Sequence, residues 1–390
     1  MVLRNVLIIT LGFQTVINLT RPVITLYASE MGATTFDIGI LTAAYAFFPL
    51  IFAIQAGKIA DTLGDRIPIL VGSLGIIASM VFPYIFPSMW ALYVSQFLIG
   101  TSSVFIAVSA QNVLGNTATS ANRDHYFSML GMAVSLGALI GPVIGGYISE
   151  HFSYSTAFLV SALIGIIPFL FSFRIPTVIR GKKQENHSVL SSIKLLNIPI
   201  LRSALISSAL VLYSRDIFVA YFPLFAKNHG ISNSMIGWII AIQGFAMIIV
   251  RLILPKLLKM FGREKVLLLS IVVAGLAFLL IPLTTDMILL GLLSCLMGFG
   301  LGCGQPLSMT TTYNASPKSR TGEVLGLRLS TNRLSQLIAP VFFGLVGTWA
   351  SVLSVFLISG VFLIGGTFLI GRGRETQLDS KNEYEKRISK

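Results

Sequence analysis

Apolar residues fill almost the whole chain in twelve runs, each long enough to cross a membrane. A helical span needs about 20 apolar residues to cross a hydrocarbon core of roughly 30 Å. Because a soluble domain has no use for such runs, the pattern predicts an all-α membrane protein with twelve transmembrane helices. The expected spans are residues 5–28, 36–57, 67–86, 90–113, 126–148, 154–174, 200–225, 234–256, 265–283, 287–312, 322–347 and 350–371.

The spans fall into two sets of six that match each other at an offset of about 198 residues. Such a repeat predicts two pseudo-symmetric, parallel six-helix bundles, over residues 1–174 and 200–371. Residues 175–199 would form a cytoplasmic linker, and the mixed-charge tail 372–390 is expected to be disordered. The matched pairs include Gly39 with Gly237, Gly64 with Gly262, and Pro142 with Pro340.

Composition agrees with a membrane protein and the placement of charge orients it. Charged residues make up 11% of the chain, against ~25% for an average soluble protein. The net charge of +13 comes from basic side chains on one side of the predicted spans, whereas the opposite loops carry a single basic residue, Lys227. This bias places both termini in the cytoplasm and the protein in the cell membrane. It also explains the charge without a nucleic-acid partner.

Enzyme chemistry has little support in this sequence. The four histidines lie in loops or at span ends, and none is spaced for a metal with a second ligand. Cys295 and Cys303 occupy one span and are expected to pack as small buried residues. We therefore expect no catalytic residue, no metal and no cofactor.

Two glycine-rich segments connect the chain to a known family. GKIADTLGDR, Gly57 to Arg66, is similar to the loop signature G-x-L-a-D-x-x-G-[RK]-[RK] of the major facilitator superfamily, and the chain resembles that superfamily over essentially its whole length. Gly57, Asp61, Gly64 and Arg66 match the signature, while Asp65 departs from it. The resemblance implies twelve helices, alternating access and a conformational gate at this loop.

The second segment is GALIGPVIGG in span five, which fits a pattern of the superfamily's drug–proton antiporters. Its small residues let helices pack closely, so a general helix-packing role is the alternative interpretation. One departure weakens the antiporter resemblance: Gln96 stands where the family often has an arginine. The packing motif comprises Gly137, Gly141, Pro142, Gly145 and Gly146.

Polar residues inside the spans mark the predicted pathway, because charge in a bilayer usually faces the bundle interior or water. Gln14, Asn18, Arg21 and Thr25 share one helical face. Arg215 lies at similar depth in the repeat-related span. Deep arginines favour an anionic group on the substrate. The remaining predicted substrate-binding residues are Gln111, Asn112, Gln305, Asn332 and Arg333.

Several roles stay open at this stage. Arg21 could contact substrate or make a structural pair, Arg333 could contact substrate or bond a neighbouring helix, and Arg215 could pair with Asp216. Arg328 lies only ~10 Å into its span and is a candidate for the cytoplasmic gate. Asp216 is the only acidic residue placed well within a span, which makes it the best candidate for a proton carrier.

The sequence thus predicts a monomeric secondary transporter, surrounded by lipid, that moves a small molecule. The preferred function is proton-coupled export of an amphipathic compound, with an anionic group favoured by the deep arginines. The alternatives are uptake, anion exchange without proton coupling, or a transporter-like sensor or lipid translocator. Substrate identity cannot be read from a fold that hosts many functions.

Overall fold

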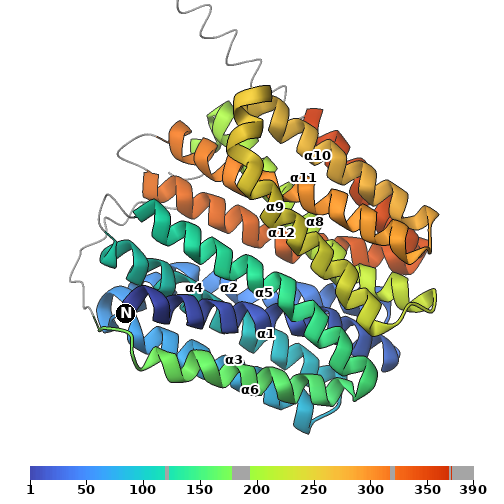
Figure 1. Cartoon of the computed structure of the whole chain (residues 1–390), viewed down its shortest axis with the longest axis horizontal. Coiled ribbons are helices and arrows are strands. Elements are labelled where there is room, and N and C mark those ends of the chain that lie inside the picture. The colour runs from blue at the N-terminus through green and yellow to red at the C-terminus, as the bar shows by residue number, and fades with distance from the viewer. Residues whose placement is uncertain (119–122, 178–193, 317–320, 369, 371–390) are drawn as a thin grey trace, which may run out of the picture.

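The computed structural model describes residues 1–118, 123–177, 194–316, 321–368 and 370, and within them it forms two bundles of six long helices (Figure 1). This confirms the predicted fold class. The first bundle holds α1 (Val2–Glu30), α2 (Thr35–Leu63), α3 (Arg66–Ile85), α4 (Met89–Thr117), α5 (Arg123–His151) and α6 (Tyr154–Ser172). The second holds α8 (Pro199–Asn228), α9 (Asn233–Phe261), α10 (Arg263–Leu280), α11 (Met287–Ala315), α12 (Thr321–Ala350) and a final helix, Val352–Phe368.

Ten of these helices are long and apolar enough to cross a membrane. The final helix is apolar but slightly shorter, at 17 residues. The remaining helix, α12, is continuous, but its sequence is less apolar because it contains polar side chains such as Arg328, Arg333 and Gln336. The chain is a multi-pass membrane protein, and the polar residues of α12 mark it as a helix that faces protein or water.

Each bundle places two helices at its outer edge. Figure 1 shows α3 and α6 along one edge of the molecule and α10 along the opposite edge. Large apolar side chains on these helices point outward, for example Leu74 and Leu170 in the first bundle and Leu269 in the second. The interface between bundles is made by other helices: α2 packs on α12, α5 on α9, and α1 on α8.

The helices run between two ends of the molecule that differ in charge. We call the end where α1 begins the basic end, because it carries Arg4, Arg66, Arg174, Lys256 and Lys259. The opposite end, where α1 finishes at Glu30, is called the far end. Among the described loop residues and helix termini of the far end, Lys227 is the one lysine or arginine.

Local sequence explains where helices begin and end. The Thr34 side chain accepts a hydrogen bond from the Asp37 backbone, and the Asp37 carboxylate accepts one from the Thr34 backbone, so α2 starts with a capping box. At the basic end, α2 and α9 finish at the repeat-related Gly64 and Gly262, with φ of 78° and 76°. A left-handed φ favours glycine, which explains why both halves keep it at this turn.

Part of the predicted linker lies outside the described residues. Lys194–Asn197 forms a short 3₁₀ helix, and Leu195 packs with Leu201, Leu205 and Val324. Residues 178–193, the tail from 371 onward, and the side chain of Asp61 in the loop signature fall outside the description, as do the surroundings of Gly57. The predicted division into two bundles, a linker and a tail therefore stays a prediction in its details.

Candidate transport pathway

At the far end the two bundles are in close backbone contact. The carbonyl of Pro340 on α12 lies where a β-carbon on Gly39 of α2 would stand. The carbonyl of Pro142 on α5 stands in the same relation to Gly237 of α9. These two contacts are related by the internal repeat, so the far end is closed by a pseudo-symmetric pair of helix crossings.

The glycine motif of α5 serves two interfaces at once. Gly137, Gly141 and Gly145 face α1, where added β-carbons would meet backbone atoms of residues 14–19. Gly146 faces α9, against the backbone of Asn233. These glycines therefore lie at close helix contacts, within the first bundle and across to the second, and their helix-packing role stays a prediction.

Hydrogen bonds between bundles add to the closure of the far end. The Phe36 backbone N–H donates to Thr348 Oγ1 at 3.0 Å. The Ser234 backbone N–H donates to the carboxylate of Glu150 at 2.6 Å. Both bonds join a helix end of one bundle to the other bundle, and both must break if the far end opens.

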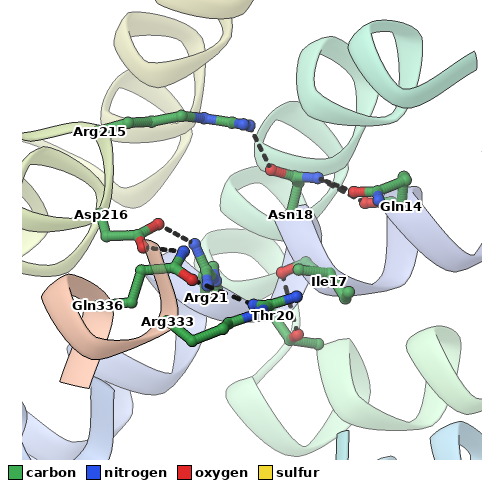
Figure 2. A network of polar contacts seen from close by, with 9 residues as sticks. All are labelled: Gln14, Ile17, Asn18, Thr20, Arg21, Arg215, Asp216, Arg333 and Gln336. Atoms are coloured by element: carbon green, nitrogen blue, oxygen red, sulfur yellow. Dashed lines mark hydrogen bonds and ion pairs between the residues drawn. The ribbon is translucent and has the colours of Figure 1, made fainter. Parts of the chain in front are cut away.

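A buried ion pair joins the bundles between the far end and the middle of the molecule (Figure 2). Arg21 Nη1 of α1 donates to Asp216 Oδ1 of α8 at 2.5 Å, and the ring of Tyr45 lies 4.4 Å from the guanidinium carbon. The other carboxylate oxygen of Asp216 accepts from Gln336 Nε2 of α12 at 2.5 Å. The Asp216 side chain is only 5% exposed, and each of its two oxygens accepts a hydrogen bond from another side chain.

The neighbouring polar residues extend this network toward the basic end. Arg215 points away from Asp216, and its Nη2 donates to Asn18 Oδ1 at 3.3 Å (Figure 2). Asn18 in turn donates to the backbone carbonyl of Gln14 at 2.7 Å. Arg333 Nη1 donates to Gln336 Oε1 at 3.1 Å. Asp216 therefore pairs with Arg21 of the other bundle, and not with its chain neighbour.

A small cavity of about 20 Å³ lies beside the ion pair, which is room for roughly one water molecule. Its polar lining comprises Arg21, Thr25, Thr42, Gln96 and Asp216. Gln96, the residue that departs from the family pattern, thus lies at the same site as the ion pair. Thr25 joins Arg21 there, as the shared helical face predicted.

A much larger cavity, of about 660 Å³, lies between the bundles on the basic side. It is lined by α4 and α5 from one bundle and by α9, α11 and α12 from the other. The predicted residues Gln111, Gln305 and Arg328 line it. The molecule is therefore closed at the far end and hollow between its bundles toward the basic end.

One polar residue of this cavity, Arg251, is absent from the sequence-based set. Arg251 Nη1 of α9 donates to Ser135 Oγ of α5 at 2.9 Å, so it also crosses between bundles. Its Nε lies 3.5 Å from the Gly302 carbonyl of α11. The sequence could have identified this residue, because Arg251 stands ten residues before the end of α9. A charged side chain about 15 Å inside a span is the kind of residue that marks a pathway.

Arg328 belongs to α12 and contacts α11. Its Nη2 donates to Gln305 Oε1 at 2.8 Å and to Ser308 Oγ at 3.2 Å. Gln305 is held in place by a bond from its Nε2 to the Ser208 carbonyl at 3.1 Å. The gate role predicted for Arg328 remains a prediction, and its position adds a second possibility, contact with whatever enters the cavity.

The remaining predicted residues take varied positions. Asn332 is buried on α12, and Asn112 is half-buried near the end of α4, where its backbone carbonyl accepts from Asn116. Arg66 lies over the ring of Phe173, 5.9 Å from its centroid. Asp65, which departs from the loop signature, is buried at the start of α3. The substrate-binding and gating roles of all these residues stay predictions.

Two six-helix bundles around an inter-bundle cavity define a polytopic transporter. A model of the Major Facilitator Superfamily matches the chain twice, over residues 6–204 and 204–389, and the chain belongs to this family. Members of the family are transporters of small molecules and not enzymes.

Relatives named for drug resistance match most of the chain. The chain is 26% identical over 357 residues to the class B tetracycline resistance protein of Escherichia coli, and the matched region covers 87% of each protein. It is 23% identical to the multidrug resistance protein MdtG of Klebsiella pneumoniae, over 88% of this chain and 86% of the relative. It is 22% identical to the quinolone resistance protein NorA of Staphylococcus aureus, over 87% of each. The chain is thus a transporter related to drug efflux proteins.

Solved structures support the same fold. A POT family transporter in complex with 5-aminolevulinic acid superposes with a TM-score of 0.78 at 16% identity, over 94% of this chain and 95% of that one. The nucleoside transporter NupG superposes with a TM-score of 0.78 at 15% identity, over 95% and 98%. At this identity the likeness concerns the fold alone.

Proposed function

We propose that this protein exports a small amphipathic molecule by alternating access, driven by protons that move in the opposite direction. One observation carries the proposal: the buried Arg21–Asp216 pair joins the two bundles on the closed side of the cavity. A carboxylate placed there can be protonated in one conformation and ion-paired in the other. The relatives named for tetracycline, quinolone and multidrug resistance support export as the direction.

The basic end lies in the cytoplasm in this proposal. Positive residues are retained on the cytoplasmic side of membrane proteins, and the far end carries little positive charge. With that orientation the large cavity faces the cytoplasm and the far end is closed to the outside. The conformation described here is then the one that takes up substrate from inside the cell.

Arrival in this conformation releases the proton. Asp216 accepts from Arg21 with one oxygen and from Gln336 with the other, so a cation already balances its charge. When the far end opens, α1 and α8 separate and Asp216 loses its cation. An unpaired carboxylate in a low-dielectric interior is costly, so protonation from the outside relieves it. In this scheme Asp216 carries one proton inward in each transport cycle.

Asp216 is favoured over other acids by its position. Among the described side chains, Asp65 and Asp216 are the buried carboxylates, and Asp65 lies at the basic end away from the bundle interface. Asp37 caps α2 at an exposed far-end position. Glu30 is half-exposed and lies 3.9 Å from Lys227. Asp37 and Glu30 are therefore open to water at the far end, whereas a proton carrier must be closed off from the two sides of the membrane in turn.

Flux measurements in proteoliposomes test the coupling. Tetracycline and norfloxacin are suitable probes, because relatives are named for resistance to these drug classes. We expect an imposed pH gradient to drive accumulation by the native protein and by Glu30→Gln, the matched control. Asp216→Asn should lose this accumulation but keep exchange of probe across the membrane. Normal pH-driven accumulation by Asp216→Asn would favour uptake or exchange without this proton step.

A conformational measurement tests the same step without any substrate. Spin labels at Ser88→Cys and Thr285→Cys would report far-end separation, one on each bundle, after Cys295 and Cys303 are replaced by alanine. Acidification should lengthen the distance in the parent protein, because in this proposal the open form, in which Asp216 has lost Arg21, is the form that binds the proton. The Asp216→Asn background should remain insensitive to pH. An equal pH response in both would contradict the proposed carrier.

A further inference from the structure

Two arginines approach the large cavity from different helices and meet neighbouring turns of α11. Arg251 lies against the carbonyl of Gly302, and Arg328 against the side chain of Gln305. Gly302 and Gln305 are three residues apart, which is a rise of about 4.5 Å along the helix. The two guanidinium groups therefore contact one short stretch of α11, of which Gln305 lines the cavity.

No described residue that lines this cavity carries a negative charge. Among the described residues, the hydrogen-bond partners of Arg251 and Arg328 are hydroxyls, carbonyls and an amide, all of them neutral. In addition, Arg328 Nε is buried without a hydrogen-bond partner. Arg21, in contrast, is neutralised by Asp216. Both arginines are half-buried, and positive charge that is partly shielded from water without a counter-charge is costly, so an anion that enters the cavity would relieve the cost.

Apolar side chains adjoin this cavity. A second cavity of about 360 Å³ lies between α1 and α5 and is lined by Arg4 and by apolar residues such as Leu7, Leu11 and Leu136. Met132, which is 50% exposed, lines both cavities and makes them neighbours. Methionine is flexible and polarisable, so this apolar surface can adapt to apolar groups of different shape.

We propose that the cavity binds an amphipathic anion, with its carboxylate or phosphate held by Arg251 and Arg328 and its apolar body against Met132, Leu11 and Leu136. The proposal rests on the transport function proposed above and names its class of substrate. Guanidinium groups bind such anions in a planar, two-pronged geometry. The cavity volume of about 660 Å³ falls in the range of small-molecule sites.

The binding test uses three probes with the same apolar body and different charge. These are 2-naphthoate, 2-naphthylmethanol and 2-naphthylmethylammonium, each added to purified full-length protein in a non-ionic detergent without a pH gradient. A ligand that binds the folded protein raises its Tm by mass action. We expect the carboxylate to raise Tm in a saturable way, and the alcohol and the amine to give only the small shift common to all three.

Variants assign the effect to the two arginines. Arg251→Gln and Arg328→Gln should each weaken 2-naphthoate binding about tenfold or more, because a charge-assisted contact is lost. Arg251→Lys should fall between, since it keeps the charge and loses the planar fork. Arg202→Gln is the matched control, because Arg202 is exposed at the start of α8 and outside the cavity. Ligand-free Tm values of all variants establish that each is folded.

Three results would overturn this site. They are equal binding of all three probes, no saturable shift with the carboxylate, or unchanged affinity in both glutamine variants. The binding test does not depend on proton coupling, so its failure can be distinguished from the failure of the proposed function. Charge-selective binding with a pH-insensitive far end would contradict the coupling alone, whereas pH-driven transport with charge-blind binding would contradict the anion site alone.

Discussion

The carbonyl of Pro142 occupies the space where a β-carbon on Gly237 would stand. Pro142 belongs to the first bundle and Gly237 to the second, so we expect this contact to be lost when the far end opens. Gly39 and Pro340 make the equivalent contact on the other side of the internal repeat. Both glycines are therefore expected to control conformation more than folding.

Gly237→Ala should open the far end. The added methyl group meets a backbone oxygen that cannot rotate away, which costs about 1–3 kcal/mol in the closed form. A cysteine at Thr42, which lines the small cavity behind the closure, would report opening to a membrane-impermeant maleimide. Its labelling rate from outside should rise about five- to a hundredfold. Gly131→Ala is the control, because nothing lies within 4 Å of its β-carbon position. Equal rates in both variants would show that Gly237 does not control closure.

Gly141→Ala should instead destabilise the protein. Its β-carbon would meet the Leu19 nitrogen and the Thr15 oxygen, which are backbone atoms of α1 in the same bundle. Since α1 and α5 pack within one bundle, we expect the strain of about 1–3 kcal/mol to act on unfolding. Tm of the purified variant should fall, while that of Gly131→Ala, in the same helix, stays level or rises slightly. A native Tm for Gly141→Ala would mean that the α1–α5 contact relaxes freely.

Arg21 and Asp216 should be strongly coupled in stability. Each single alanine variant leaves one buried charge unpaired and should cost about 3–5 kcal/mol. The double variant should cost much less than the sum of the two. The free energy of unfolding in mixed micelles would be measured for all four members of the cycle.

Glu30 and Lys227 provide the comparison for that cycle. They also form an ion pair between bundles, but their side chains are 51% and 42% exposed and the atoms are 3.9 Å apart. Their coupling should stay below about 1 kcal/mol. Equal coupling in the two cycles would mean that Arg21 is not a pairing residue, and substrate contact would become its leading role.

The orientation can be measured directly. Lys227→Cys and Lys259→Cys place exposed cysteines at the far and basic ends, in the Cys295→Ala/Cys303→Ala background. If the positive residues face the cytoplasm, intact cells should label the first with an impermeant reagent and the second only after permeabilisation. The reverse pattern would invert the proposed direction of transport.

The sequence by itself determined the helices, their grouping into two bundles and the glycine turns. These depend on local properties: the length of an apolar run, the period of the repeat, and the left-handed φ that glycine adopts readily, as at Gly64 and Gly262. The shared face of Gln14, Asn18, Arg21 and Thr25 was predictable for the same reason, because helical spacing is local.

Only the tertiary structure decided how the charges are paired. Arg21 and Asp216 are 195 residues apart, and the packing of α1 on α8 brings them together while it turns Arg215 toward Asn18. The same packing leaves Arg251 and Arg328 beside the large cavity without a described acidic neighbour. Hydrophobicity fixes which segments are helices, but it acts without direction, so the partners of buried charges follow from the way the helices interlock.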